Sequence, residues 1–131
     1  MVLVDTNILA YLLIEGDCTS ASQALYARDP DWRSEDFILV EFSNVLTTYV
    51  RTKALTHHQG SQLLAKALAI LPSLASVEHA QAFDAATEFG ISAYDGRFIA
   101  IAKQMKSRLV TEDVKLRAAV PAWTVSLGDV A

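Results

Sequence analysis

Four acidic residues stand where an apolar run of the chain meets the start signal of a helix: Asp5, Glu41, Asp95 and Asp113. Carboxylate oxygens are hard ligands of the kind that bind Mg²⁺ or Mn²⁺. Zinc is not expected, because the three His and one Cys of the sequence lack the spacing of a zinc-binding set. If the fold brings the four junctions together, their carboxylates form a site for a divalent cation.

Asp5 and Asp113 follow the same kind of segment. Val2–Val4 is a short apolar run that ends at Asp5, and this pattern predicts a buried strand followed by a capped helix. Arg108–Thr111 leads to Asp113 in the same way. The residues after Asp5 could cap the first helix without it, so Asp5 is expected to be free for another role. Both acids are thus predicted at the carboxyl ends of strands, beside a hydroxyl side chain.

Glu41 and Asp95 belong to predicted helices. Glu41 lies in the apolar helical pattern of Phe37–Thr52, beyond the first turn. An ionised carboxylate buried there without a partner is costly, so either the helix exposes Glu41 or a cationic group meets it. Asp95 ends the capping-box-like segment Ser92–Asp95, and helix capping is its simplest role. Acids are also favoured in first turns for dipole reasons, so both capping and function stay open for Asp95 and Asp113.

The hydrophobic periodicity predicts strands that alternate with helices along the chain. The expected strands are Val2–Val4, Trp32–Ser34, Leu74–Val77, Leu109–Thr111 and Trp123–Ser126. The expected helices are Asn7–Leu13, Thr19–Ala27, Phe37–Thr52, one from the Thr56 capping box to Ile70, Glu78–Phe89, Tyr94–Lys106 and Val114–Ala119. This order predicts an α/β protein with a mostly parallel sheet covered by helices and a site at the carboxyl ends of the strands. Because no linker or repeat interrupts the pattern, residues 1–131 are expected to form one domain.

The four acids lie in segments that span nearly the whole chain: Val4–Leu9, Glu41–Leu46, Ser92–Asp95 with Phe98–Ala102, and Leu109–Leu116. In their order along the chain, these segments resemble those of PIN-domain nucleases, in particular the toxins of VapC-type toxin–antitoxin pairs. The resemblance implies a three-layer α/β/α PIN-like fold with a mostly parallel central sheet flanked by helices. It also implies a complete catalytic and metal-binding quartet, formed by Asp5, Glu41, Asp95 and Asp113.

The expected reaction is Mg²⁺- or Mn²⁺-dependent hydrolysis of an RNA phosphodiester bond, by a toxin that inhibits translation or growth. Asp5, Asp95 and Asp113 are the expected direct or water-mediated ligands, and Glu41 completes the site or orients the nucleophile. Amide and hydroxyl groups nearby can hold metal-bound waters and fix carboxylate rotamers. The candidates for this supporting role are Thr6, Asn7 and Thr111. Helix capping accounts for each of them equally well.

The resemblance further implies a homodimer and a cognate antitoxin whose basic or aromatic segment enters the acidic groove. The residues point to a partner as well. Ile8–Ile14 and the Phe37–Thr52 helix carry more apolar side chains than one sheet-covering face needs, so another chain is expected to cover some of them.

Composition and charge limit the other possibilities. The chain has 131 residues, of which 52% are hydrophobic, enough for one domain with a core. No apolar run approaches the roughly 20 residues of a membrane span and no leader segment is evident, so a soluble cytoplasmic protein is expected.

The net charge of −4 is concentrated in residues 1–65, which hold 4 Lys or Arg against 8 Asp or Glu. Two basic groups, Lys103–Arg108 and Arg51–His58, could meet phosphates or simply form solvated helix ends. Arg97 could meet a phosphate or pair with a site acid.

Three other functions account for part of the pattern. A magnesium-dependent phosphatase also has an Asp after its first strand, but it generally needs a second acid two residues later, where this chain has Asn7. A receiver-like phosphoacceptor domain needs an Asp at the third strand and a Lys at the last, and neither is evident. A catalytically silent module that only binds another protein is the alternative of a different class. Metal-dependent RNA cleavage that is lost on changing Asp5 distinguishes the nuclease from this module.

Overall fold

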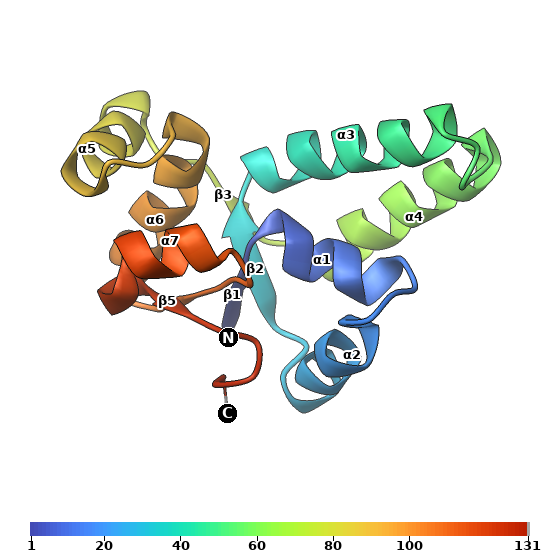
Figure 1. The fold of residues 1–131 in the computed structure, drawn as a ribbon, viewed down its shortest axis with the longest axis horizontal. Helices are drawn as coiled ribbons and strands as arrows, with labels where there is room; N and C mark the ends of the chain where they lie inside the picture. Colours follow the sequence, from blue (N-terminus) through green and yellow to red (C-terminus); the bar gives the residue numbers. More distant parts are fainter. Residues whose placement is uncertain (131) are drawn as a thin grey trace.

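The structure, a computed structural model, describes residues 1–130. Within this range, five strands alternate with seven α-helices and one 3₁₀ helix (Figure 1). The strands are β1 Val2–Val4, β2 Trp32–Glu35, β3 Leu74–Ala75, β4 Leu109–Val110 and β5 Thr124–Val125. The helices are α1 Thr6–Leu13, α2 Thr19–Arg28, α3 Phe37–Arg51, α4 His57–Ile70, α5 His79–Phe89, α6 Ala93–Met105, α7 Val114–Ala119 and the 3₁₀ helix η1 Pro121–Trp123. None of these described helices has the length and apolar character of a membrane span.

All five strands form one sheet in the order β3-β2-β1-β4-β5, and every pair of neighbours is parallel. The central strand is β1, in which Leu3 lies beside Arg33 of β2 and Leu109 of β4. The chain moves outward from β1 in both directions, so the strand order reverses between β1 and β4. Ligand sites of such sheets lie outside the carboxyl ends of the strands at this reversal. Asp5 follows β1 and Asp113 lies just beyond β4, so both are placed there.

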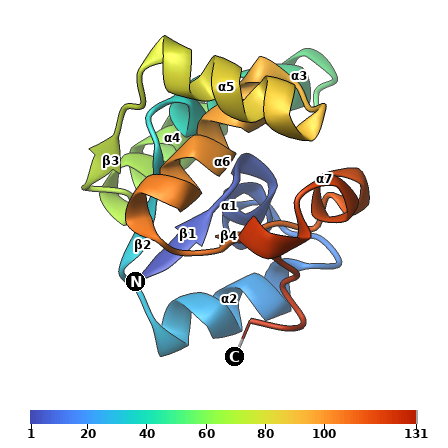
Figure 2. The same ribbon diagram turned by 90° about the vertical axis from the view of Figure 1, so that its left-hand side faces the viewer.

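Helices cover both sides of the sheet. In Figure 1, α1 to α4 lie on one side of the strands and α5 to α7 on the other. Figure 2 shows α6 lying across the strands with α5 packed on it. The largest side chains enclosed between these layers are almost completely buried, and they include Leu3, Ile8, Phe42, Ile99 and Leu109. Each such burial contributes about 1.5–3 kcal/mol, and the predicted three-layer α/β/α architecture is confirmed.

Side-chain caps explain where two helices begin. The capping box predicted at Thr56 is complete: Thr56 Oγ1 accepts from the Gln59 N–H at 3.1 Å, and Gln59 Oε1 accepts from the Thr56 N–H at 2.9 Å. Asp5 caps α1 by accepting a hydrogen bond from the Ile8 N–H at 3.1 Å. The expectation that later residues cap this helix is therefore wrong, because α1 already begins at Thr6.

Helices α5 and α6 approach each other most closely at Gly96. A Cβ atom at this position would lie 2.4 Å from the carbonyl oxygen of Ala82 and 3.2 Å from the Cβ of Ala86. Only a residue without a side chain allows two helix backbones to come this near. Because Gly96 directly follows Asp95, this packing also positions an acid of the predicted site.

Three strands are shorter than the sequence predicts. Strand β4 ends at Val110, one residue before the predicted end. Strand β3 ends at Ala75, because the Val77 N–H donates to the Glu35 side chain at 3.3 Å instead of extending the ladder. Strand β5 begins at Thr124 rather than one residue earlier, because Pro121–Trp123 forms a 3₁₀ turn. None of these differences moves a predicted site residue.

Candidate active site

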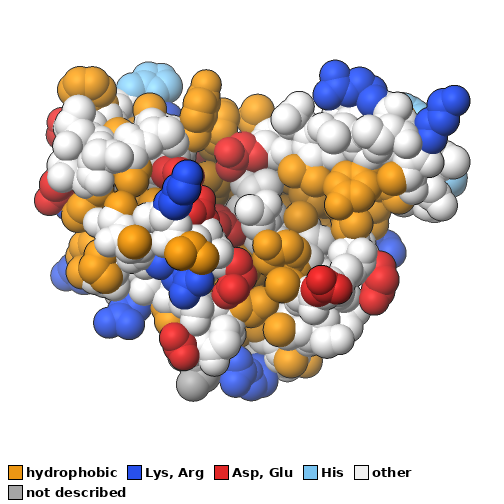
Figure 3. All heavy atoms as spheres, viewed as in Figure 1, with side chains coloured by type: hydrophobic (Ala, Val, Ile, Leu, Met, Phe, Trp, Pro, Cys, Tyr) orange, Lys and Arg blue, Asp and Glu red, His pale blue; other side chains and the backbone are white. Residues whose placement is uncertain are grey.

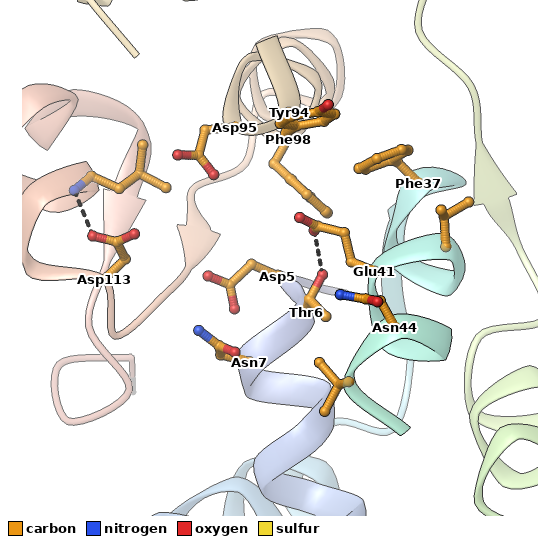
Figure 4. A pocket seen from close by; sticks show the side chains of 13 residues that line it. Asp5, Thr6, Asn7, Phe37, Glu41, Asn44, Tyr94, Asp95, Phe98 and Asp113 are labelled. Atoms are coloured by element: carbon orange, nitrogen blue, oxygen red, sulfur yellow. Dashed lines mark hydrogen bonds between the residues drawn. The ribbon is translucent and has the colours of Figure 1, made fainter. Parts of the chain in front are cut away.

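The four predicted acids line one cleft at the carboxyl ends of the central strands. The cleft has a volume of about 510 Å³, and Asp5, Glu41, Asp95 and Asp113 reach it from four different parts of the chain. Figure 3 shows acidic side chains gathered in the hollow between the two groups of helices. In Figure 4 the four carboxylates surround the same space. The fold therefore brings together all four acids that the sequence singles out.

Asp5 has the most strongly perturbed carboxyl group of the four. The pKa of Asp5 is raised from 3.8 to about 6, and removal from solvent is the main cause. Hydrogen bonds from the Thr111 hydroxyl and the Ile8 N–H oppose this rise, whereas the negative charges of Asp95 and Glu41 add to it. A carboxylate whose ionised form is disfavoured in this way gains from a nearby cation.

Glu41 lies in the second turn of α3 and is half-buried. Its Oε1 accepts a hydrogen bond from the Thr6 hydroxyl at 2.6 Å, which joins α3 to α1. Burial raises the pKa of Glu41, the Thr6 hydrogen bond lowers it and the charge of Asp95 raises it further. Of the two predicted alternatives for this acid, exposure to the cleft is the one found, and the partner that meets it is a hydroxyl rather than a cation.

Asp95 lies in the first turn of α6 but does not cap it. The cap is Ser92, whose Oγ accepts from the Asp95 N–H at 3.1 Å. Within the described chain, the reciprocal bond from the Ser92 backbone to the Asp95 carboxylate is not formed, so the predicted capping role of Asp95 is wrong. Its carboxylate faces the cleft instead (Figure 4). Burial raises the pKa of Asp95, the charge of Asp113 adds to this, and a hydrogen bond with the Ser92 side chain opposes it.

Asp113 is both a helix cap and a cleft residue. Its Oδ1 accepts from the Leu116 N–H at 3.0 Å, which caps α7, and its own N–H donates to Thr111 Oγ1 at 3.1 Å. The side chain is exposed. Because the cap uses Oδ1, Oδ2 is the oxygen that Asp113 offers to a ligand.

The three predicted supporting residues also lie at the site. Thr6 is buried and holds Glu41. Thr111 is fully buried between Asp5 and Asp113 and forms hydrogen bonds with both. Asn7 lines the cleft with an exposed amide. The two threonines therefore fix carboxylates, and the asparagine is placed to contact a ligand.

A buried ion pair beside the cleft was not foreseen. Arg97 Nη2 lies 2.9 Å from Glu35 Oε1, and the Glu35 side chain is completely buried. Glu35 also accepts from the N–H groups of Phe37 at 2.7 Å and Val77 at 3.3 Å. Arg97 thus pairs with an acid outside the predicted site, which corrects the expectation that it meets a phosphate or a site acid. The pair ties the start of α3 to α6, the two helices that carry Glu41 and Asp95. Nothing in the sequence marks Glu35 as the buried member of two adjacent acids.

The donor atoms of the cleft suit Mg²⁺ or Mn²⁺, since its lining provides carboxylate, hydroxyl and amide oxygens. In residues 1–130, no three His, Cys, Asp or Glu side chains converge closely enough to enclose a metal ion. Mg²⁺ usually keeps several waters and is held by one or two carboxylates, so acids spread around an open cleft fit it without a tight cage. No Lys or Arg of this range forms an ion pair with any of the four acids, so the protein leaves their charge without a partner.

The chain shares its sequence pattern with a known family. The PIN domain family matches residues 2–120. This protein belongs to the PIN domain family. The resemblance of its sequence to PIN domains is thereby confirmed. Comparison with curated proteins gave no match.

Solved structures with the same fold share little sequence with this PIN domain. A protein from Pyrobaculum aerophilum is 20% identical with a TM-score of 0.79, covering 96% of this chain and 88% of that chain. A toxin–antitoxin complex from Klebsiella pneumoniae is 21% identical with a TM-score of 0.72, covering 97% and 98% of the two chains. FitAcB from Neisseria gonorrhoeae is 18% identical with a TM-score of 0.72, covering 99% and 100%. Similarity at this level shows that the fold is shared.

Proposed function

We propose that this PIN-domain protein is a Mg²⁺- or Mn²⁺-dependent ribonuclease that hydrolyses RNA phosphodiester bonds. The observation that carries the proposal is the convergence of Asp5, Glu41, Asp95 and Asp113 on one cleft, without a basic partner in the described residues. Groups of carboxylates hold divalent cations of the kind that assist phosphodiester cleavage. Membership of the PIN family supports the same activity.

The acids divide into ligands and a water-orienting group. Three of the acids would hold the cation directly or through water: Asp5, Asp95 and Asp113. They act on one another's titration, because the charge of Asp95 raises the pKa of Asp5 and that of Asp113 raises the pKa of Asp95. When bound, such a cation lowers the pKa of water, polarises a phosphate oxygen and offsets charge on the leaving oxygen. Glu41, fixed by the Thr6 hydroxyl, orients the attacking water and accepts its proton.

We further propose that the protein is the toxin of a toxin–antitoxin pair. The sequence resemblance to VapC-type toxins supports this role, and one structure of the same fold is a toxin–antitoxin complex. In this role the protein would cut RNA in the cytoplasm and so inhibit translation or growth. A cognate antitoxin would restrain it, and its expected form without the antitoxin is a homodimer.

The variant Asp5→Asn tests the ribonuclease proposal. Asn is as good a helix N-cap as Asp, so the variant keeps the cap of α1 and loses only the charge. The wild type should cleave unstructured RNA only with Mg²⁺ or Mn²⁺, and metal at 100 times its Kd should stabilise the fold by about 2.7 kcal/mol. Asp5→Asn should lose both the cleavage and the stabilisation, as measured by thermal unfolding and product formation.

The matched control is Asp17→Asn, which neutralises an exposed acid outside the cleft and should behave as the wild type. An undiminished metal response in Asp5→Asn would remove Asp5 from the site. A wild type that binds neither metal and cleaves no RNA would favour the catalytically silent binding module.

A further inference from the structure

Two aromatic rings stack at the edge of the acidic cleft. Phe37, the first residue of α3, and Tyr94, in the first turn of α6, have ring centroids 5.3 Å apart and ring planes inclined by 15°. Phe37 lies one helical turn before Glu41, and Tyr94 is adjacent to Asp95 in the chain. The pair therefore bridges the same two helices that carry these two acids, and Figure 4 shows the rings beside the carboxylates.

Tyr94 is open to solvent on the side away from its partner. Its side chain is 61% exposed even though Phe37 covers one face of the ring, so the opposite face and the hydroxyl are accessible. Packing of the core does not explain an aromatic pair that leaves so much ring surface in water. Phe37 and Tyr94 line both the acidic cleft and an adjoining groove of about 550 Å³. The open ring face is thus continuous with the site of the four acids.

The cleft offers no side chain of positive charge to a phosphate. Its lining, within residues 1–130, contains no Lys, Arg or His. Arg97 in the same helix as Tyr94 is only 16% exposed and is held by Glu35 and by the carbonyl of Val77. Inside the cleft, an RNA strand therefore draws affinity from the cation and from uncharged contacts. Stacking of bases on aromatic side chains is the main uncharged contribution in single-strand binding and depends little on sequence.

We propose that the Phe37–Tyr94 pair is a stacking platform for an unpaired nucleobase of the RNA substrate, next to the phosphate at the four acids. This inference rests on the proposed ribonuclease function. A base is the occupant that matches the platform, because the open ring is flat and adjoins Asp95 directly, so a nucleotide flanking the cut bond reaches it. Bases of a duplex are already stacked and cannot reach a side chain. The platform therefore selects single-stranded RNA.

The variant Tyr94→Leu removes the ring but keeps apolar bulk at an exposed position, so the fold should persist, with an unchanged Tm as the check. On an unstructured RNA oligonucleotide of mixed sequence, its KM should rise about tenfold, while kcat and Mg²⁺ affinity stay the same. Tyr94→Phe, which restores the ring, should restore the KM. The control is Phe83→Leu, because Phe83 is 64% exposed in the adjoining groove but does not line the cleft.

Oligonucleotides with one abasic nucleotide on either side of the cut bond give the closing experiment. With the wild type, one abasic position should raise KM about tenfold, and Tyr94→Leu should show no further loss at that position. Equal abasic penalties in both proteins would overturn the platform. An unchanged KM in Tyr94→Leu would also overturn it. A wild type that cleaves no RNA with Mg²⁺ or Mn²⁺ would instead refute the ribonuclease function, and the platform with it.

Discussion

The carboxyl group of Asp5 must ionise to bind a cation, and burial opposes that ionisation. Its pKa is raised from 3.8 to about 6. Between pH 3.8 and about 6, the folded protein therefore holds a proton that the unfolded chain has released. Stability contributed by the protonated group is fully present below the unfolded pKa and is lost as the pH rises through the folded pKa. The raised pKa values of Glu41 and Asp95 act in the same direction.

We therefore predict that the metal-free protein carries a destabilising contribution from Asp5 that grows as the pH rises from 3.8 to about 6. A shift of this size corresponds to about 3 kcal/mol. Urea unfolding in the presence of a chelator, at a series of pH values, measures it. Asp5→Asn should remove this contribution, and subtracting its profile from that of the wild type isolates Asp5 together with its coupling to Asp95 and Glu41. A difference that stays constant across the range would contradict the prediction.

Glu41→Gln should be tolerated by the fold and fail in catalysis. The amide oxygen of Gln can accept the hydrogen bond from the Thr6 hydroxyl, and a neutral side chain avoids the cost of burying a charge. Thermal unfolding of the metal-free variant should match or exceed that of the wild type, whereas the cleavage rate should fall by about 100-fold or more. The exposed acid Glu15 provides the control Glu15→Gln, which should change neither quantity. If Glu41→Gln unfolds, Glu41 is a structural residue.

At the scale of single residues, the sequence reveals the acids whose neighbours along the chain form a pattern. Asp5 and Asp113 follow apolar strands, and Glu41 and Asp95 lie in recognisable helices, so all four could be predicted. Glu35 could not, because its partner Arg97 is 62 residues further along the chain and only the fold brings the two together. The stacked pair of Phe37 and Tyr94 was missed for the same reason.

Among the elements, the contact between α5 and α6 bears most directly on the site. We predict that Gly96→Ala destabilises the protein by about 1–3 kcal/mol, because the added Cβ meets backbone that a side-chain rotation cannot relieve. The obstructing atom is the carbonyl oxygen of Ala82, 2.4 Å away. Moving α6 away from α5 also displaces Asp95, so Mg²⁺ affinity and cleavage should fall. Urea unfolding and calorimetric metal titration measure both effects.

Gly16→Ala is the matched control, since no atom lies within 4 Å of a Cβ built at Gly16. It should leave the free energy of unfolding and the metal affinity near the wild-type values. Full stability and full cleavage in Gly96→Ala would show that the two helices adjust without moving the site.

Helix starts were easier to predict than strand ends, because different interactions set them. The start of α4 depends on the local capping box of Thr56 and Gln59, which the sequence displays. The end of β3 depends on a hydrogen bond from Val77 to Glu35 in another strand, and the sequence does not reveal this bond. The parallel sheet follows from the alternation of elements, whereas the pairing of β1 with both β2 and β4 is a property of the folded chain.

Over the whole molecule, only one of the two regions expected to carry excess apolar surface exposes it. The excess expected on α1 is buried or half-buried within the chain, with Ile8 and Leu9 fully enclosed, because α1 packs on both α2 and α3. Helix α3, the second region expected to be rich in apolar surface, does expose Val40 and Tyr49. The large exposed hydrophobic residues of the described chain are Met1, Val40, Tyr49, Leu68, Phe83, Tyr94 and Val114.

We predict that the isolated protein is a dimer, because association would cover apolar side chains such as Tyr49 and Leu68. Light scattering across a concentration series should give twice the mass of one chain at the higher concentrations. Raising the salt concentration should not dissociate a dimer held by apolar contacts, since screening weakens only ionic ones. A strictly monomeric mass throughout the series would refute the prediction.

The charge of the whole molecule points to the chemistry of an inhibiting partner. The net charge is −4, and the cleft combines four acids with the apolar rings of Phe37 and Tyr94. A basic or aromatic segment of an antitoxin would complement both features and would compete with metal and RNA for the same space. We predict that expression of the protein alone arrests growth, and that co-expression with the product of the adjacent upstream gene gives a tighter, inactive complex and relieves the arrest. Asp5→Asn is the control, since it should cause no arrest with or without the partner. Unchanged growth arrest despite stable co-expression would count against that partner.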